Sequence, residues 1–112
     1  MRRAWILALG LLAAAACGER KELSLAEQGS RIYAANCTIC HNPEPGCDGV
    51  DGPALAGSPH ELIEARVMRA EYPPGYTPKR PTRRMRPLPY LKPHIEALAA
   101  YLGGLEAEAH SQ

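Results

Sequence analysis

The sequence predicts an all-α domain in which three helices are joined by long loops. Three segments carry apolar residues at helical spacing, together with residues that start or stop helices. The segments between them are rich in proline and glycine, which number 11 and 10 among the 112 residues, and they show no usable period. Loops rather than strands are therefore expected between the helices.

The first expected helix covers residues 25–36. Ser24 can cap it, and Glu27 stands at the third helical position, which together make the pattern of a capping box. Gly29 is small and lies on the apolar face, so it permits close approach of another element. The larger apolar residues of that face are Leu25, Ile32 and Tyr33.

The second and third expected helices cover residues 60–69 and 93–103. Pro59 stands near the start of the second helix, and Glu61 suits the positive end of its dipole. The third helix should stop at Gly103-Gly104. Its apolar face consists of Ile95, Leu98, Tyr101 and Leu102.

Two loops complete the expected domain. Residues 37–57 are rich in Pro, Gly, Asp and Asn and should form a long loop. The segment 72–89 contains six prolines, which remove backbone donors and fix φ, so a helix or a central strand is excluded there. Those prolines are Pro73, Pro74, Pro78, Pro81, Pro87 and Pro89.

The chain has few side chains with which to build a core. Phenylalanine is absent, and aromatic residues make up 5% of the sequence. Removal of an export segment would leave fewer than 100 residues to fold. A staple or a bound cofactor is therefore expected to complete the core.

Residues 1–17 have the pattern of an export signal. Arg2 and Arg3 form a positive start, and residues 4–16 are an almost uninterrupted apolar run, too short to span a bilayer comfortably. Cleavage is expected before Cys17, because Ala-Ala-Ala-Cys at 14–17 resembles the lipobox of bacterial lipoproteins. The mature protein would then be exported to the periplasm and anchored to a membrane through lipidated Cys17. Ordinary cleavage near Ala16, which leaves Cys17 a plain thiol, is the alternative.

The remaining residues divide into three parts by composition. Residues 18–23 form a short polar tether, residues 24–105 the folded domain, and residues 106–112 a polar tail. Without Arg2 and Arg3, 11 basic residues stand against 12 acidic ones, so the mature chain is close to neutral. A nucleic-acid partner is therefore not expected.

The strongest motif of the sequence is Cys-Thr-Ile-Cys-His at residues 37–41. Cys37 and Cys40 are three positions apart and can reach the two vinyl groups of one haem, while His41 presents its imidazole to the iron. A thioredoxin-like dithiol would need a βαβ context, and a zinc site would need further paired ligands. One covalently bound haem c is therefore the favoured interpretation.

Other short patterns accompany this motif along the chain. Gly29 and Tyr33 precede it, Gly-Pro-Ala-Leu-Ala-Gly follows at 52–57, a Pro-rich loop contains a methionine, and an apolar helical segment occupies 95–102. With these patterns, residues 24–105 resemble class I cytochrome c of the bacterial mono-haem type. The resemblance implies a small cytochrome c fold around the haem and a function in electron transfer, with no enzyme activity and no small-molecule substrate.

The resemblance also implies roles for further residues. The first and last helices would cross where Gly29 meets Tyr101. The carbonyl of Pro53 would accept the free N–H of His41 and orient that ligand. Met85, in the loop before the last helix, would be the sixth iron ligand, and its sulfur would favour reduced iron.

The surroundings of Met85 depart from the family pattern. The family often has Met followed directly by Pro, whereas Arg86 stands here between Met85 and Pro87. The other candidates for the sixth ligand are Met68, His60 and His94, of which Met68 falls within an expected helix.

The expected function is that of an electron carrier, and the alternative is a haem c subunit of a multi-subunit periplasmic oxidoreductase. In either case the partners are redox proteins that donate or accept electrons. A basic loop could steer an acidic partner or could pair with the haem propionates. Its residues are Lys79, Arg80, Arg83, Arg84 and Arg86.

Cys47 has no role in this scheme. It is a harmless thiol in a variable loop, a disulfide partner of Cys17 if lipidation does not occur, or a contact to a partner subunit.

Overall fold

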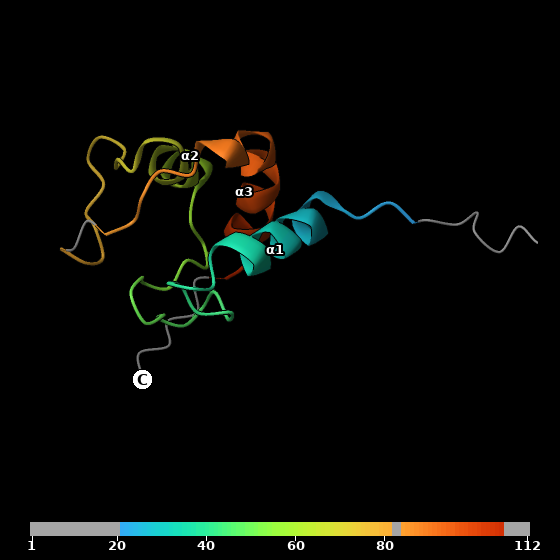
Figure 1. Cartoon of the computed structure of the whole chain (residues 1–112), viewed down its shortest axis with the longest axis horizontal. Helices are drawn as coiled ribbons and strands as arrows, with labels where there is room; N and C mark the ends of the chain where they lie inside the picture. Colours follow the sequence, from blue (N-terminus) through green and yellow to red (C-terminus); the bar gives the residue numbers. More distant parts are fainter. Residues whose placement is uncertain (1–20, 82–83, 107–112) are drawn as a thin grey trace, which may run out of the picture.

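The structure, a computed structural model, describes residues 21–81 and 84–106 (Figure 1). These residues contain three α-helices, one 3-10 helix and no strand, so the all-α prediction is confirmed. The elements are α1 (Leu25–Asn36), α2 (His60–Arg69), η1 (Pro89–His94) and α3 (Ile95–Gly103). The export signal with Cys17, the first half of the tether, Arg83 and the tail beyond Glu106 lie outside the described residues. Across these described ranges, no helix combines the length and apolarity needed to cross a membrane.

Helix α1 begins at the predicted capping box. The backbone N–H of Glu27 donates to Ser24 Oγ over 3.1 Å, and the N–H of Ser24 donates to Glu27 Oε2 over 2.8 Å. Leu25, which the helical spacing places on the apolar face, is 48% exposed. Leu25 lies in the first turn, where α1 extends beyond α3 (Figure 1).

Helices α1 and α3 cross with their backbones in close contact at Gly29. A Cβ atom on Gly29 would lie 1.9 Å from the carbonyl oxygen of Ala97 and 2.8 Å from Cβ of Tyr101. The crossing of Gly29 with Tyr101 that the family resemblance implied is therefore present. Beside it, the rings of Tyr33 and Tyr101 meet with centroids 5.8 Å apart at an angle of 56°.

The core collects apolar side chains from every helix. Tyr33 of α1 and Leu98 of α3 are the largest fully buried side chains. Burial of each large apolar side chain contributes about 1.5–3 kcal/mol, so this small cluster holds the helices together. Its members are Tyr33, Ile63, Val67, Leu91, Ile95, Leu98 and Leu102.

The start of the C-terminal helical segment differs from the prediction. Residues 89–94 form the 3-10 helix η1, whereas a helix was excluded up to residue 89 and expected from residue 93. Pro89 stands in the first turn, where no N–H donor is needed, so the proline that argued against a helix instead begins one. Through η1, Leu91 enters the core with 2% of its surface exposed.

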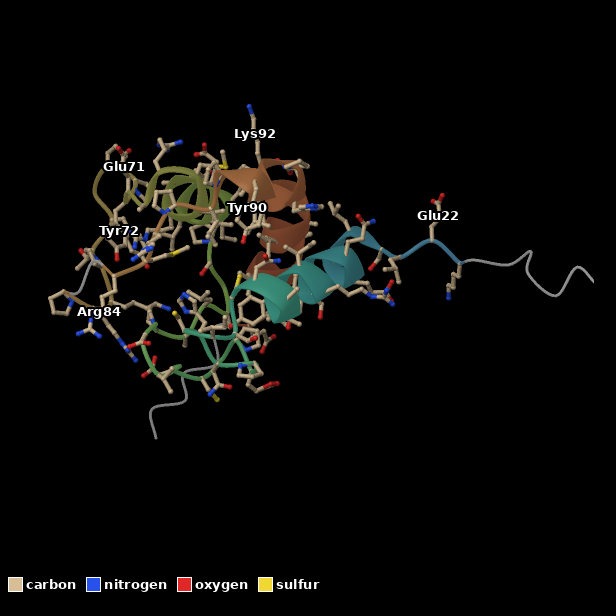
Figure 2. The ribbon with its side chains drawn as sticks, in the orientation of Figure 1. Glu22, Glu71, Tyr72, Arg84, Tyr90 and Lys92 are labelled. Atoms are coloured by element: carbon tan, nitrogen blue, oxygen red, sulfur yellow. The ribbon has the colours of Figure 1, made fainter. Side chains whose placement is uncertain are left out.

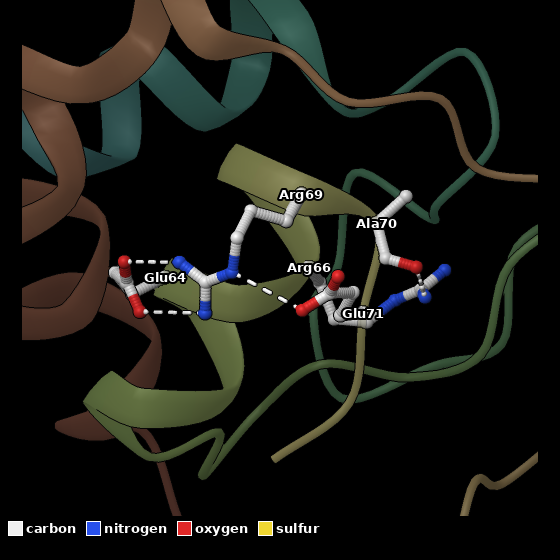
Figure 3. A network of polar contacts seen from close by, with 5 residues as sticks. All are labelled: Glu64, Arg66, Arg69, Ala70 and Glu71. Carbon is white, nitrogen blue, oxygen red and sulfur yellow. Dashed lines mark hydrogen bonds and ion pairs between the residues drawn. The ribbon is translucent and has the colours of Figure 1, made fainter.

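The end of α2 is fixed by ion pairs and hydrogen bonds (Figure 3). Arg69 contacts Glu64 through two N···O distances of 2.7 and 3.3 Å and Glu71 through one of 3.2 Å, and it lowers the pKa of the Glu64 carboxyl. Ala70 then turns the chain with a left-handed φ of 54°. The guanidinium of Arg66 donates to the carbonyl of Ala70 over 2.7 Å, so this turn directs the following loop toward α2.

We predict that Gly29→Ala destabilises the protein, because the added methyl group overlaps the backbone of Ala97. Overpacking of this kind costs about 1–3 kcal/mol of unfolding free energy. Denaturant unfolding measures the loss, with Arg31→Ala on the exposed side of the same helix as the control. A Gly29→Ala protein as stable as the control would contradict the close crossing.

Candidate haem-binding site

A cavity of about 500 Å³ lies between the two long loops and helices α2 and α3. In Figure 1 both loops lie on the side of the helices away from residues 21–24. The cavity volume falls within the range of about 300–1,000 Å³ that small-molecule and cofactor sites occupy. The apolar wall is formed mainly by Leu55, Leu62, Ile63, Val67, Leu88, Leu98 and Leu102.

The Cys-Thr-Ile-Cys-His motif lies at this cavity because α1 ends there. Cys37 is the C-cap of α1, and its N–H donates to the carbonyl of Tyr33 over 2.9 Å. The chain then turns tightly, and the N–H of His41 donates to the carbonyl of Cys37 over 2.9 Å. The turn brings Cys37, Cys40 and His41 together on the cavity wall.

The imidazole of His41 is held by the backbone of the same loop. Its Nδ1 lies 2.9 Å from the carbonyl oxygen of Pro53. A carbonyl oxygen can only accept, so Nδ1 carries the proton in this bond and Nε2 keeps its lone pair. Burial lowers the pKa of His41, an effect that the bond to Pro53 partly offsets. The ring is therefore neutral at neutral pH, which is the form that binds a metal.

A glycine makes room for the imidazole. A Cβ atom on Gly52 would lie 2.4 Å from Cε1 of His41, so no side chain fits there. The N–H groups of Asp51 and Gly52 both donate to the carbonyl of Cys40, over 3.1 and 2.9 Å. Gly49, which the sequence analysis did not single out, approaches equally closely, with a Cβ position 2.2 Å from the Cys40 carbonyl oxygen.

The thiols do not have the properties of a redox-active dithiol. Cys37, Cys40 and Cys47 are all free cysteines. Burial raises the pKa of the Cys37 thiol to about 11, whereas a nucleophilic thioredoxin-type cysteine needs a lowered pKa. Within the described parts of the chain, no three His, Cys, Asp or Glu side chains gather as metal ligands. Cys47 is exposed and lies outside the cavity.

Met85 lines the cavity, whereas the other candidates for a sixth ligand do not. The Met85 side chain is half-buried and packs against the core cluster. Met68 also packs against that cluster but away from the cavity lining. His60 pairs with Glu96 at 2.7 Å on the exposed surface between α2 and α3, and His94 likewise lies outside the lining.

A stack of aromatic and cationic groups forms a part of the wall that the sequence analysis missed. The guanidinium carbon of Arg66 lies 4.2 Å from the centroid of the Tyr72 ring. Tyr72 stacks in turn on Tyr76, with centroids 5.5 Å apart and an interplanar angle of 7°. Burial raises the pKa of Tyr76. The Tyr-Pro-Pro-Gly-Tyr sequence at 72–76 is the signal that could have indicated this turn.

The residues present fit a covalently attached haem. The apolar cavity is large enough for a cofactor, two thiols and one neutral imidazole line it, and a thioether sulfur is available in the same space. Four cations of the basic loop also line the cavity, namely Lys79, Arg80, Arg84 and Arg86.

Comparison with known proteins finds similarity to a solved structure. No protein-family model matches the chain, and no curated protein matches it. Among solved structures, the chain is similar to the PsbV2 cytochrome from the cyanobacterium Thermosynechococcus elongatus, with 20% identity, 76% of each chain covered and a TM-score of 0.40. A likeness of this degree carries no weight for function, which is inferred below from the residues of the cavity.

We predict that Gly52→Ala displaces the imidazole of His41, because the new methyl group occupies the position of the ring edge. The bond from Nδ1 to Pro53 should weaken, which ¹⁵N NMR of the ring detects through changed shifts and faster exchange of the ring proton. Val50→Ala is the control, since this side chain belongs to the same loop and is 83% exposed. Unchanged His41 signals in Gly52→Ala would show that the glycine is not required.

Proposed function

We propose that the protein is an electron carrier of the c-type cytochrome class, with one haem held by Cys37, Cys40, His41 and Met85. One observation carries the proposal. The Cys-Thr-Ile-Cys-His turn and a methionine sulfur line the same apolar cavity of about 500 Å³, and the histidine in that turn is already oriented by Pro53.

The proximal residues each have a defined task. Cys37 and Cys40 would hold the haem through two thioethers, each thiol adding its S–H across one vinyl double bond with no leaving group. The Pro53 carbonyl holds the proton on Nδ1 of His41, so the Nε2 lone pair is available to the iron. When bound, the haem supplies an iron that alternates between the ferric and ferrous states.

The distal residues support electron transfer rather than catalysis. The soft sulfur of Met85 favours ferrous iron and raises the reduction potential relative to a second imidazole. His41 and Met85 would together occupy the positions on the iron at which a substrate could otherwise bind. The leucine-rich wall excludes water from the cavity. The surroundings of the iron would therefore rearrange little when its charge changes on gaining or losing an electron.

The proposal extends to location and partners. Residues 1–17 have the pattern of an export signal, and Cys17 stands at the lipobox position, so the mature protein is anchored at the periplasmic side of a membrane. Its partners are donor and acceptor redox proteins. The cations beside the cavity suit partners with acidic surfaces.

Intact mass spectrometry of protein from the membrane fraction tests the attachment. The wild type should carry the full mass of one haem and of the acyl groups on Cys17. Cys37→Ala/Cys40→Ala should lose the haem mass and keep the acyl mass, because only the thioethers are removed. Cys47→Ala is the matched control and should keep both additions, since its thiol is exposed and outside the cavity.

A wild-type protein without the haem mass would contradict the proposed function. A wild-type protein with haem but without acyl groups would leave electron transfer intact and remove the anchor.

A further inference from the structure

The loop that carries Met85 is held to the opposite loop by side chains. Within the described residues, no backbone hydrogen bond joins 77–81 or 84–87 to another element. The next backbone bond along the chain is at Leu88, whose N–H donates to the carbonyl of Val67 over 2.7 Å. The position of Met85 therefore depends on its own packing against the core cluster and on side-chain contacts made by its neighbours.

Three such contacts lead to the loop that supports His41. Lys79 Nζ donates to the carbonyl of Ala54 over 2.8 Å. Arg80 lies 3.7 Å from Asp48 Oδ1, and Arg84 lies 3.5 Å from Asp51 Oδ1. Lys79 is 25 positions from Ala54 in sequence, and Arg84 is 33 positions from Asp51. Figure 2 shows Arg84 on the loop after α2, directed toward the loop after α1. We call the two ion pairs Arg80–Asp48 and Arg84–Asp51 the clasp.

Both carboxylates of the clasp belong to ordered parts of the His41 loop. Oδ1 of Asp48 accepts the N–H of Ala54 over 2.9 Å, and its backbone carbonyl accepts from the Asn42 side chain over 3.1 Å. The N–H of Asp51 donates to the Cys40 carbonyl over 3.1 Å. The Asp48 carboxylate is therefore held by the loop backbone, and Asp51 is held through its own backbone N–H.

The clasp joins the two loop segments that carry the proposed iron ligands. Asp51 precedes Gly52, which packs against the His41 ring, and Arg84 precedes Met85. We propose that Asp48 and Asp51 are positioning residues that hold Met85 in the cavity through Arg80 and Arg84. The inference rests on the proposed function, since it concerns how firmly Met85 stays on the iron.

The exposure of these groups determines how strong the effect is. The side chains of Arg84 and Asp51 are 76% and 46% exposed, and those of Arg80 and Asp48 are 32% and 70% exposed. Such pairs are weak individually and are screened by salt. The clasp should therefore shift the balance between bound and released Met85 by a modest factor that depends on ionic strength.

Imidazole binding to the ferric protein measures this balance, because the probe reaches the iron only when Met85 leaves it. Asp48→Asn/Asp51→Asn removes both charges and keeps an oxygen that can accept from Ala54. We expect imidazole to bind about 3- to 10-fold more tightly to this variant at low salt. The difference should largely disappear at about 1 M salt, where the Debye length is about 3 Å.

Control variants separate the clasp from general effects of charge. Glu22→Gln/Glu61→Gln also removes two exposed carboxylates, and Figure 2 shows Glu22 far from Arg84, so its imidazole affinity should match the wild type. Arg80→Gln/Arg84→Gln breaks the same pairs from the other side and should give the same tightening. Asp51→Arg/Arg84→Asp exchanges the charges of one pair and keeps them opposite. Its imidazole affinity should therefore lie closer to the wild-type value than that of the variants that break the pairs.

Two results would overturn the clasp while leaving the proposed function in place. One is an unchanged imidazole affinity in Asp48→Asn/Asp51→Asn when the wild type has a covalent haem with methionine bound. The other is tighter binding in the arginine variant alone, which would mean that the arginines act on a group other than these carboxylates. A wild-type protein without covalent haem would instead remove the proposed function itself.

Discussion

The close contact of α1 with α3 at Gly29 is the constraint on which the rest of the structure depends. Because the Ala97 carbonyl occupies the space of a Cβ at Gly29, the two helices meet at backbone distance and their relative position is fixed. Helix α1 ends at Asn36, directly before Cys37, so the same contact fixes where the motif begins. Helix α3 supplies Leu98 and Leu102 to the cavity wall. One crossing thus sets the distance between the thiols and the apolar wall.

The two proposed iron ligands are held in different ways. His41 is fixed by backbone groups, since the Pro53 carbonyl binds its Nδ1 and Gly52 leaves only enough space for the ring. Met85 lies in a segment held by packing against the core and by side-chain contacts with the facing loop. A rigid proximal side and a more weakly held distal side follow from this difference. If both residues bind the iron as proposed, Met85 is the ligand that changes position more easily.

Local signals were sufficient to predict much of the fold. The capping box at Ser24 and Glu27 gave the start of α1, and the range predicted for α2 agrees with its observed bounds. The 3-10 helix η1 was missed because its prolines were counted as breakers, although a proline in the first turn loses no hydrogen bond. The exposure of Leu25 could not be predicted, because helical period shows which side a residue faces and the extent of the neighbouring helix decides whether it is covered.

The site could be predicted only where its residues are adjacent in sequence or match a known pattern. The spacing of Cys37, Cys40 and His41 is itself typical of haem attachment, so this part of the site could be predicted without a structure. The role of the clasp carboxylates could not be predicted, because their ion pairs join two loops that meet only after folding. The stack of Arg66, Tyr72 and Tyr76 was missed for the same reason.

The absorption spectrum of oxidised Met85→Leu, compared with Met68→Leu, tests the central claim most directly. Both changes nearly conserve volume, and both residues pack against the same core cluster, so the two variants differ mainly in which sulfur is lost. If Met85 binds the iron of a covalent haem, Met85→Leu loses the far-red sulfur-to-iron band and Met68→Leu retains it. A band that persists in Met85→Leu would contradict the account.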